Sequence, residues 1–140
     1  MKKKSYWLIK TEPEEWSWWQ QIKSKNKEAE WNGVRNYQAS NNLKSMKKND
    51  LCFFYHTGKE KKIIGIAKVI KEHFKDKSDK TQKFVSVIIK ALYPLKREVS
   101  LEKIKKDKYF KDFSLVKQSR LSVMEVNLKY WKKICKMGKV

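Results

Sequence analysis

Short runs of apolar residues, separated by polar turns, predict β-strands along much of the chain. The runs lie at residues 5–10, 51–56, 62–70, 84–93 and 122–126, and their lengths and bordering turn residues are typical of strands. Two of these runs, 62–70 and 84–93, carry apolar residues at both odd and even positions. That pattern indicates strands covered on both faces, as in a barrel or in a sheet covered by helices.

Helical spacing of apolar residues appears between the predicted strands. Thr11 followed by Glu14 fits a capping box. Trp16, Trp19 and Ile22 would then share one face of the helix that begins there. A second helix is expected over residues 36–46, because apolar side chains recur there at intervals of four and three: Ala39, Leu43 and Met46.

Two short helices are expected in the second half of the chain. Ser100 is a candidate cap for a helix over 100–106, and Asn127 for a final helix that ends near Gly138. The final helix would place apolar side chains on its inner face: Leu128, Trp131 and Ile134.

Two polar and charged segments, 24–30 and 71–83, are predicted to be loops. Strands with interspersed short helices predict an α+β fold around a mixed, barrel-like sheet. A chain of 140 residues suits one domain.

The composition supports a domain with one core. Hydrophobic residues make up 40% of the chain, including six Trp, six Tyr and six Phe. No apolar run approaches the roughly 20 residues needed to span a bilayer, and the first residues lack the apolar stretch of a signal peptide. Cys52 and Cys135 suggest no disulfide framework. We therefore expect reduced thiols, a cytoplasmic location and no membrane association.

The charge is strongly positive, at +20, with 35 Lys and Arg against 15 Asp and Glu. Such a surface attracts polyanions such as nucleic acid. A lysine excess is also produced by an AT-rich genome, so the charge permits this function without requiring it. Only three of the cations are arginine, at positions 35, 97 and 120. Because arginine presents a planar fork of donors, these positions are the more informative ones.

Metal binding and catalysis lack a signature in the sequence. Cys52, His56, His73 and Cys135 never fall at short ligand spacings. The chain has no Gly-x-Ser-x-Gly elbow, and its four glycines form no phosphate-binding loop. We therefore expect a protein that is not an enzyme and that needs no metal or cofactor.

Aromatic, amide and hydroxyl side chains near turns are the remaining candidates for chemistry. Residues 31–38 place Trp31 beside a glycine turn and Arg35 beside the amides of Asn36 and Gln38. An aromatic ring can stack on a base while amides read its edge and arginine holds a phosphate. The alternative for Trp31 is a core residue, and for the amides capping and solvent exposure.

Five segments, in this order along the chain, resemble the EVE domains, among them the thymocyte nuclear protein family. They are YWLIKTEP at 6–13, WNGVRNYQA at 31–39, FFYH at 53–56, GIAKV at 65–69 and VKQSRLSV at 116–123. The resemblance spans nearly the whole chain and implies a single EVE domain over 1–140. Its fold would be a PUA-like mixed β pseudo-barrel flanked by short helices, related to the YTH and ASCH domains. It implies binding of DNA or RNA with modified bases, such as methylated cytosine or adenine, and no catalysis.

Carried over by position, the resemblance implies a base-binding pocket and two phosphate contacts. Arg35 and Arg120 would hold phosphate. The pocket would comprise Thr11, Glu12, Pro13, Trp31, Gly33, Val34, Asn36, Gln38, Phe54, Tyr55, His56, Ser119 and Ser122. This chain departs from the family pattern at Asn32, where Asp is usual, at Ser40, where a basic residue is usual, and after Phe74, where Pro is common.

The sequence thus leads to the hypothesis of a monomeric nucleic-acid reader that stacks one base on Trp31. Two alternatives remain open: an RNA-processing or base-modifying enzyme on the same barrel, and a basic RNA-associated protein without base selectivity.

Overall fold

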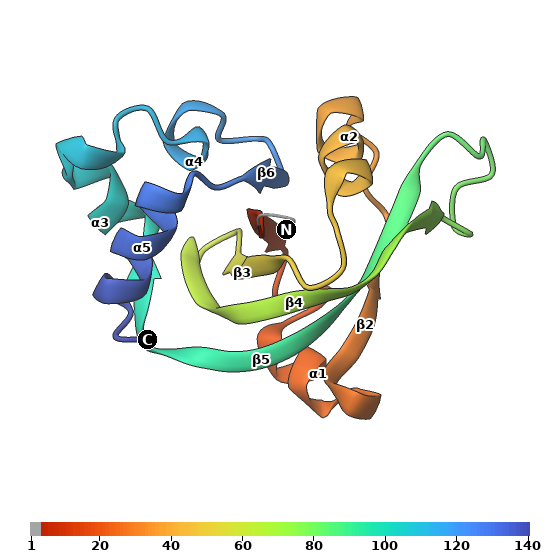
Figure 1. The fold of residues 1–140 in the computed structure, drawn as a ribbon, viewed down its shortest axis with the longest axis horizontal. Helices are drawn as coiled ribbons and strands as arrows, with labels where there is room; N and C mark the ends of the chain where they lie inside the picture. Colours follow the sequence, from red (N-terminus) through yellow and green to blue (C-terminus); the bar gives the residue numbers. More distant parts are fainter. Residues whose placement is uncertain (1–3) are drawn as a thin grey trace.

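A single mixed sheet forms the framework of the protein, whose computed structural model describes residues 4–140 (Figure 1). Its strand order is β2-β5-β4-β3-β1-β6, in which only the β1–β3 pair is parallel. The strands are β1 (Tyr6–Thr11), β2 (Glu28–Trp31), β3 (Leu51–His56), β4 (Lys62–Lys75), β5 (Val85–Ser100) and β6 (Val123–Glu125).

The long β4–β5 pair gives the sheet its curvature. These strands have 14 and 16 residues, and their pairing shifts register at four places. Each shift inserts an irregularity that bends and twists the pair. The ribbon of β4 and β5 therefore sweeps around the other strands, as Figure 1 shows. The strands β2 and β6 remain as the two edges of the sheet.

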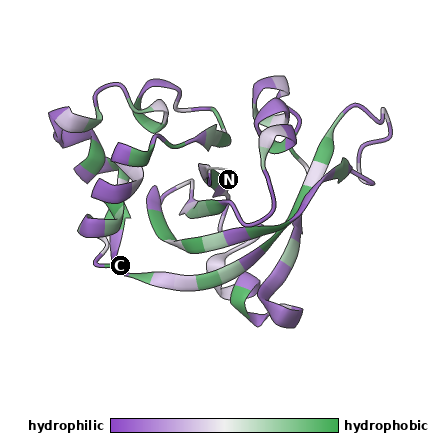
Figure 2. Cartoon of the chain, viewed as in Figure 1, coloured by the Kyte–Doolittle hydropathy of each residue, from purple (hydrophilic) through white to green (hydrophobic). Residues whose placement is uncertain are grey.

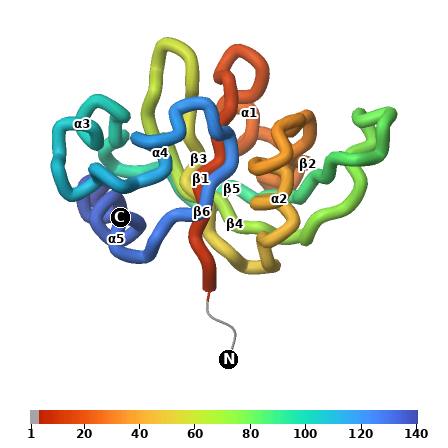
Figure 3. The backbone as a smooth tube through the Cα atoms, turned by 90° about the horizontal axis from the view of Figure 1, so that it is seen from above, coloured from red at the N-terminus to blue at the C-terminus, as the bar shows by residue number. Residues whose placement is uncertain are grey.

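Short helices flank the sheet at both ends. They are α1 (Trp18–Lys23), α2 (Tyr37–Ser45), α3 (Leu101–Lys106), α4 (Ser114–Lys117) and α5 (Leu128–Met137), with 3-10 turns η1 (Lys25–Lys27) and η2 (Lys108–Phe110). Seen from above, α3, α4 and α5 gather at one end, and α1, α2 and β2 at the other (Figure 3). The expected α+β class with a mixed, barrel-like sheet and short helices is confirmed.

The predicted caps at Ser100 and Asn127 are confirmed, and Asn36, at the predicted start of the second helix, is a cap as well. Each side chain accepts a hydrogen bond from a backbone N–H two or three residues later. Such caps satisfy donors that the first turn of a helix leaves unpaired, so the signal is local and readable from the sequence.

The predicted start of the first helix is wrong. Helix α1 begins seven residues after Thr11 and is capped by Ser17, whose Oγ accepts from the Gln20 N–H at 3.2 Å. The predicted inner face is wrong as well, because Trp18 is fully buried whereas Trp19 is 58% exposed. A tertiary contact selects this start: the Trp18 N–H donates to Nε2 of buried His56 at 3.0 Å.

Both predicted loops contain strand residues. Within 24–30 the edge strand β2 begins at Glu28, and β4 continues to Lys75, so the connection to β5 is the shorter segment 76–84. We call residues 76–84 the hairpin loop. The end of β4 shows no alternation because charged side chains occupy its exposed positions, and β2 alternates over only four residues, too few for a clear signal. Figure 2 shows the hydrophilic colouring of the hairpin loop, beside the largely hydrophobic start of β5.

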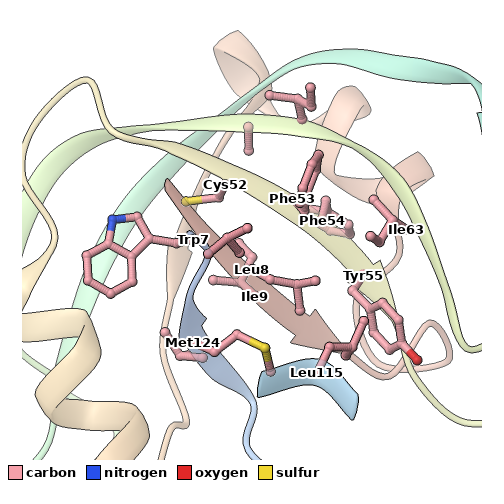
Figure 4. Packing of buried hydrophobic residues seen from close by; sticks show 14 of the residues in the cluster. Trp7, Leu8, Ile9, Cys52, Phe53, Phe54, Tyr55, Ile63, Leu115 and Met124 are labelled. Carbon is pink, nitrogen blue, oxygen red and sulfur yellow. The ribbon is translucent and has the colours of Figure 1, made fainter. Parts of the chain in front are cut away.

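The hydrophobic core lies between the curved sheet and the helices. Trp7, Leu8 and Ile9 of β1 pack with Phe53 and Phe54 of β3 (Figure 4). Cys52 is buried in this core and Cys135 is half-buried, and both are free thiols. Within residues 4–140, none of the helices combines the length and the apolar character that crossing a membrane requires.

Candidate nucleic-acid interface

A cavity of about 740 Å³ lies beside the edge strand β2. Its walls come from the end of β1 with the turn that follows it, from β2, and from the loop that leads into α2. The volume falls within the roughly 300–1,000 Å³ that is usual for ligand sites. The lining residues are Lys10, Thr11, Glu12, Glu15, Trp16, Glu28, Ala29, Glu30, Trp31, Asn32, Gly33, Val34, Arg35, Asn36 and Ser122.

The structure brings about half of the predicted site residues together at this cavity. Those that line it are Thr11, Glu12, Trp31, Gly33, Val34, Arg35, Asn36 and Ser122. Those that do not are Pro13, Gln38, Phe54, Tyr55, His56, Ser119 and Arg120. Three of the recognised segments contribute residues to both groups, whereas the segment 53–56 contributes none to the cavity.

Trp31 serves both as a wall of the cavity and as a core residue. It ends β2 and is 7% exposed. Its ring meets the Phe54 ring edge-on, with centroids 5.4 Å apart and planes at 77°. Phe54 itself is fully buried and supports Trp31 from behind. The cavity therefore has a rigid aromatic wall whose position is set by the core.

Tyr55 and His56 are buried and have partners inside the protein. Burial raises the pKa of Tyr55 to about 12. His56 Nε2 accepts the Trp18 N–H at 3.0 Å, so the ring proton is on Nδ1, which donates to Glu60 at 3.0 Å. The first bond holds α1 against β3, and the second ties His56 to the turn between β3 and β4.

Asp76 fixes the loop that forms one wall of the cavity. Its buried Oδ2 accepts from the Gly33 N–H at 2.8 Å and from Arg35 Nη1 at 2.9 Å, and Arg35 Nη2 donates to Ser78 at 3.0 Å. Gly33 allows this approach because its φ of +80° lies in the left-handed region. We call the contacts among Gly33, Arg35, Asp76 and Ser78 the Asp76 latch.

The Asp76 latch keeps its carboxylate ionised. Burial raises the pKa of Asp76, but the hydrogen bonds from Ser78, Arg35 and Gly33 together outweigh it and lower the pKa to about 2. Arg35 therefore has an internal counterion, although its side chain is 40% exposed. Its guanidinium also lies 5.5 Å from the centre of the Phe84 ring.

Lys10 is the cavity residue that sequence reasoning missed most clearly. Its Nζ donates to the Ser119 carbonyl at 2.9 Å and lies 5.6 Å from the centre of the Tyr55 ring. Burial lowers the pKa of Lys10. The bond ties Ser119, which does not line the cavity, to a residue that does. No local pattern marks Lys10, because its partner lies 109 residues away.

Asp76 was also missed, although a weak signal exists. Asp76 and Asp79 each precede a hydroxyl residue by two positions, Ser78 and Thr81, and each bonds to it in an Asx turn. The spacing predicts the turns but does not reveal that Asp76 also reaches Gly33, 43 residues away.

Carboxylates outnumber cations among the residues around the cavity. Lys10 and Arg35 are its cations, and its acidic residues are Glu12, Glu15, Glu28 and Glu30. The chain as a whole has the opposite balance, 35 cations to 15 carboxylates. Within residues 4–140, no group of three or more Cys, His, Asp or Glu side chains is placed to hold a metal ion. The arrangement suits a largely uncharged ligand group in the cavity and anionic groups outside it.

Comparison with known proteins identifies the family. The EVE domain model matches residues 5–137. Mouse thymocyte nuclear protein 1 is 42% identical over 83 residues, which is 51% of this chain and 36% of that protein. The matched region thus spans about a third of this curated relative.

Solved structures agree with this match. A Rhodopseudomonas palustris protein shares 44% identity and a TM-score of 0.90, over 96% of this chain and 93% of that one. Human THYN1, solved with DNA containing 5-methylcytosine, shares 27% identity and a TM-score of 0.89, over 97% and 98%. A Zygosaccharomyces rouxii YTH domain, at 16% identity and TM-score 0.62 over 100% and 87%, shows likeness of fold alone. The chain belongs to the EVE domain family and has its PUA-like fold.

Proposed function

We propose that this protein is a non-catalytic reader of nucleic acid that takes one modified base, of the 5-methylcytosine type, into the cavity beside β2. The observation that carries the proposal is the aromatic wall of the cavity, in a chain whose fold matches human THYN1 over 97% of its length. THYN1 was solved with DNA that contains 5-methylcytosine.

Trp31 supplies stacking in this proposal. Stacking on an aromatic ring contributes about 1–3 kcal/mol per base. A methyl group on the base adds about 0.8 kcal/mol of apolar burial, or roughly a four-fold lower Kd. A rigid wall gains most from such a group because it need not rearrange on binding.

Asn36 supplies a polar contact to the edge of the base. Its side-chain oxygen accepts the Ala39 N–H at 2.9 Å as the cap of α2. The NH₂ group of Asn36 is then the part that can donate to a ligand. A base carbonyl or ring nitrogen is the matching acceptor.

The phosphates would lie outside the cavity, on the lysine-rich surface. Carboxylates around the cavity disfavour an anion within it, whereas the net charge of +20 attracts the backbone. Phosphate neutralisation releases counterions, so log affinity should fall linearly with log salt, by roughly 0.7–0.9 per contact. A salt titration of oligonucleotide binding that came out flat would contradict this part of the proposal.

A binding screen tests the base selectivity. Oligonucleotides of one sequence would carry cytosine, 5-methylcytosine, adenine or N6-methyladenine at one position, each as single strand and as duplex. We expect the tightest binding for 5-methylcytosine. Equal affinity for all of them would reject selective reading and favour a basic protein that binds without selectivity.

Trp31→Phe tests the wall while retaining an aromatic core residue. We expect it to reduce the preference for 5-methylcytosine and leave the salt slope unchanged. Trp19→Phe is the matched control, because Trp19 is exposed and does not line the cavity. A similar loss in both variants would reject the assignment of Trp31 as the wall.

Incubation with labelled DNA and RNA, with and without divalent metal, tests the non-catalytic part. We expect the nucleic acids to remain intact. Turnover that disappears on mutation of the cavity would establish the enzyme alternative instead.

A further inference from the structure

An exposed aromatic surface lies directly beside the cavity. Tyr37 is 63% exposed, and its ring packs on the Phe84 ring with centroids 5.1 Å apart and planes at 35°. The Arg35 guanidinium lies 5.5 Å from the centre of the same Phe84 ring. We call Tyr37, Phe84 and Arg35 the rim platform.

The rim platform adjoins the cavity through the chain itself. Arg35 belongs to both, and Asn36, which lines the cavity, is followed directly by Tyr37. The Cα atoms of such neighbours are about 3.8 Å apart. Figures 1 and 3 both show α2 beside the β4–β5 pair near the hairpin loop, which carries Phe84. A ligand in the cavity therefore has the platform at its rim.

The surroundings hold the platform rigidly. The Phe84 N–H donates to Asp79 Oδ2 at 2.8 Å, and Arg35 is held in the Asp76 latch. Tyr37 begins α2, whose buried side chains, Ala39 and Leu43, attach it to the core. Because these buried residues anchor α2, the helix would stay in place without the exposed ring of Tyr37. A rigid exposed ring binds a planar group at little cost in conformational entropy.

The hairpin loop, which carries Phe84 of the platform, also carries positive charge. Lys77, Lys80 and Lys83 are exposed, and none of the ion pairs among residues 4–140 involves them. The two carboxylates of the loop, on Asp76 and Asp79, are buried and occupied by hydrogen bonds. The loop that supports the platform thus presents exposed ammonium groups to solvent, and positive charge together with an aromatic ring is the combination that binds single-stranded nucleic acid.

We propose that the rim platform binds the nucleotide that flanks the base in the cavity. The flanking base stacks on Tyr37, and its phosphate meets the lysines of the hairpin loop. This inference rests on the proposed function, because the position of the flanking nucleotide is defined by a base in the cavity. Stacking accepts any base, so the platform adds affinity at the flanking position without reading its sequence.

Oligonucleotides that lack the base next to 5-methylcytosine measure the contribution of stacking on Tyr37. Three single-stranded oligonucleotides would carry 5-methylcytosine with both neighbouring bases, with an abasic site on its 5′ side, or with one on its 3′ side. We expect one of the two abasic oligonucleotides to bind wild-type protein about five- to 150-fold more weakly than the intact one, the equivalent of about 1–3 kcal/mol.

Tyr37→Ala should weaken binding of the intact oligonucleotide by a similar factor. It should leave the affinity for the sensitive abasic oligonucleotide unchanged, because the contact is already missing there. Tyr37→Trp should restore binding. Tyr109→Ala is the matched control, since Tyr109 is 45% exposed and has the Lys133 ammonium 4.3 Å from its ring centre, but lies outside the cavity and the platform. Thermal melts of each variant verify that it is folded.

The outcomes separate this inference from the proposed function. Equal binding of all three oligonucleotides, or a Tyr37→Ala protein that binds like wild type, overturns the platform even if 5-methylcytosine is preferred over cytosine. If the wild-type protein shows no preference for 5-methylcytosine over cytosine, the proposed function is overturned instead, whatever the effect of the Tyr37 variants.

Discussion

The two ends of the molecule use aromatic residues in different ways. At the end formed by α3, α4 and α5, the rings of Phe110, Phe113 and Tyr130 pack on one another with centroids 5.0–5.9 Å apart. Trp131 stacks on Phe53 at 3.9 Å. At the other end Trp31 has a ring on one side and the cavity on the other.

The difference lies in what holds the neighbouring backbone. At the helical end, the aromatic side chains pack against one another and fill the interior. At the cavity end, the loop after Trp31 is held by the Asp76 latch, so its position does not depend on apolar packing. Hydrogen bonds are directional and satisfy loop donors without filling the space beside them. A polar latch can therefore keep a cavity open where apolar packing would close it.

The largest expected effect is a difference in stability between alanine variants of Trp131, at the helical end, and Trp31, at the cavity end. Trp131→Ala should cost about 3–5 kcal/mol of unfolding free energy, because it opens a hole in a packed interior. Trp31→Ala should cost less, because its ring already borders a cavity, but it alone should reduce base selectivity. Urea unfolding measures the costs, and oligonucleotide binding measures the selectivity. A greater cost for Trp31→Ala would contradict the contrast between a filled and an open end.

Acid should weaken the Asp76 latch. Its folded pKa of about 2 lies below the ordinary value near 4. The stability from ionised Asp76 is therefore present above about pH 4 and is lost as the pH falls toward about 2. Asp76→Asn should cost about 1–3 kcal/mol at neutral pH and reduce the acid dependence in that window.

The control at the helical end is Asp107→Asn. Asp107 pairs with Lys133 at 3.0 Å, but both side chains are 36% exposed, so the pair contributes less. Chemical unfolding at pH 7 and at pH 3 checks both variants. Equal pH dependence in wild type and Asp76→Asn would contradict the role given to the latch.

The smallest expected effect compares two helix caps. Asn36 caps α2 at the cavity and Asn127 caps α5 at the helical end, with bonds of 2.9 and 3.0 Å. Each alanine variant should cost about 0.5–2 kcal/mol, but only Asn36→Ala should weaken base binding. Asn36→Asp retains the cap and removes the NH₂ donor, so it should lose binding with little loss of stability. Thermal melts and oligonucleotide binding give the two readouts, and unchanged binding in Asn36→Asp would exclude Asn36 as a ligand contact.

Local patterns predicted much of the fold, and the resemblance to EVE domains predicted about half of the cavity. The strand β3 begins and ends with its apolar run. The caps at Asn36, Ser100 and Asn127 lie within three residues of the N–H groups from which they accept hydrogen bonds. The loop that carries Trp31, Gly33, Val34, Arg35 and Asn36 lines the cavity as a continuous stretch of chain. Such features depend on neighbours in sequence, and a single sequence therefore contains them.

The sequence by itself thus determined the class of fold, the starts of α2, α3 and α5, and the family to which the chain belongs. The tertiary structure decided where α1 begins, that β2 is a strand, and which residues from the recognised segments reach the cavity. Those outcomes depend on the pairing of β2 with β5. They also depend on the bonds from Trp18 to His56, from Gly33 to Asp76 and from Lys10 to Ser119, whose partners lie 38, 43 and 109 residues apart. A hydrogen bond needs its two atoms within about 3 Å, and no local pattern in a sequence shows which distant residues the fold will bring that close.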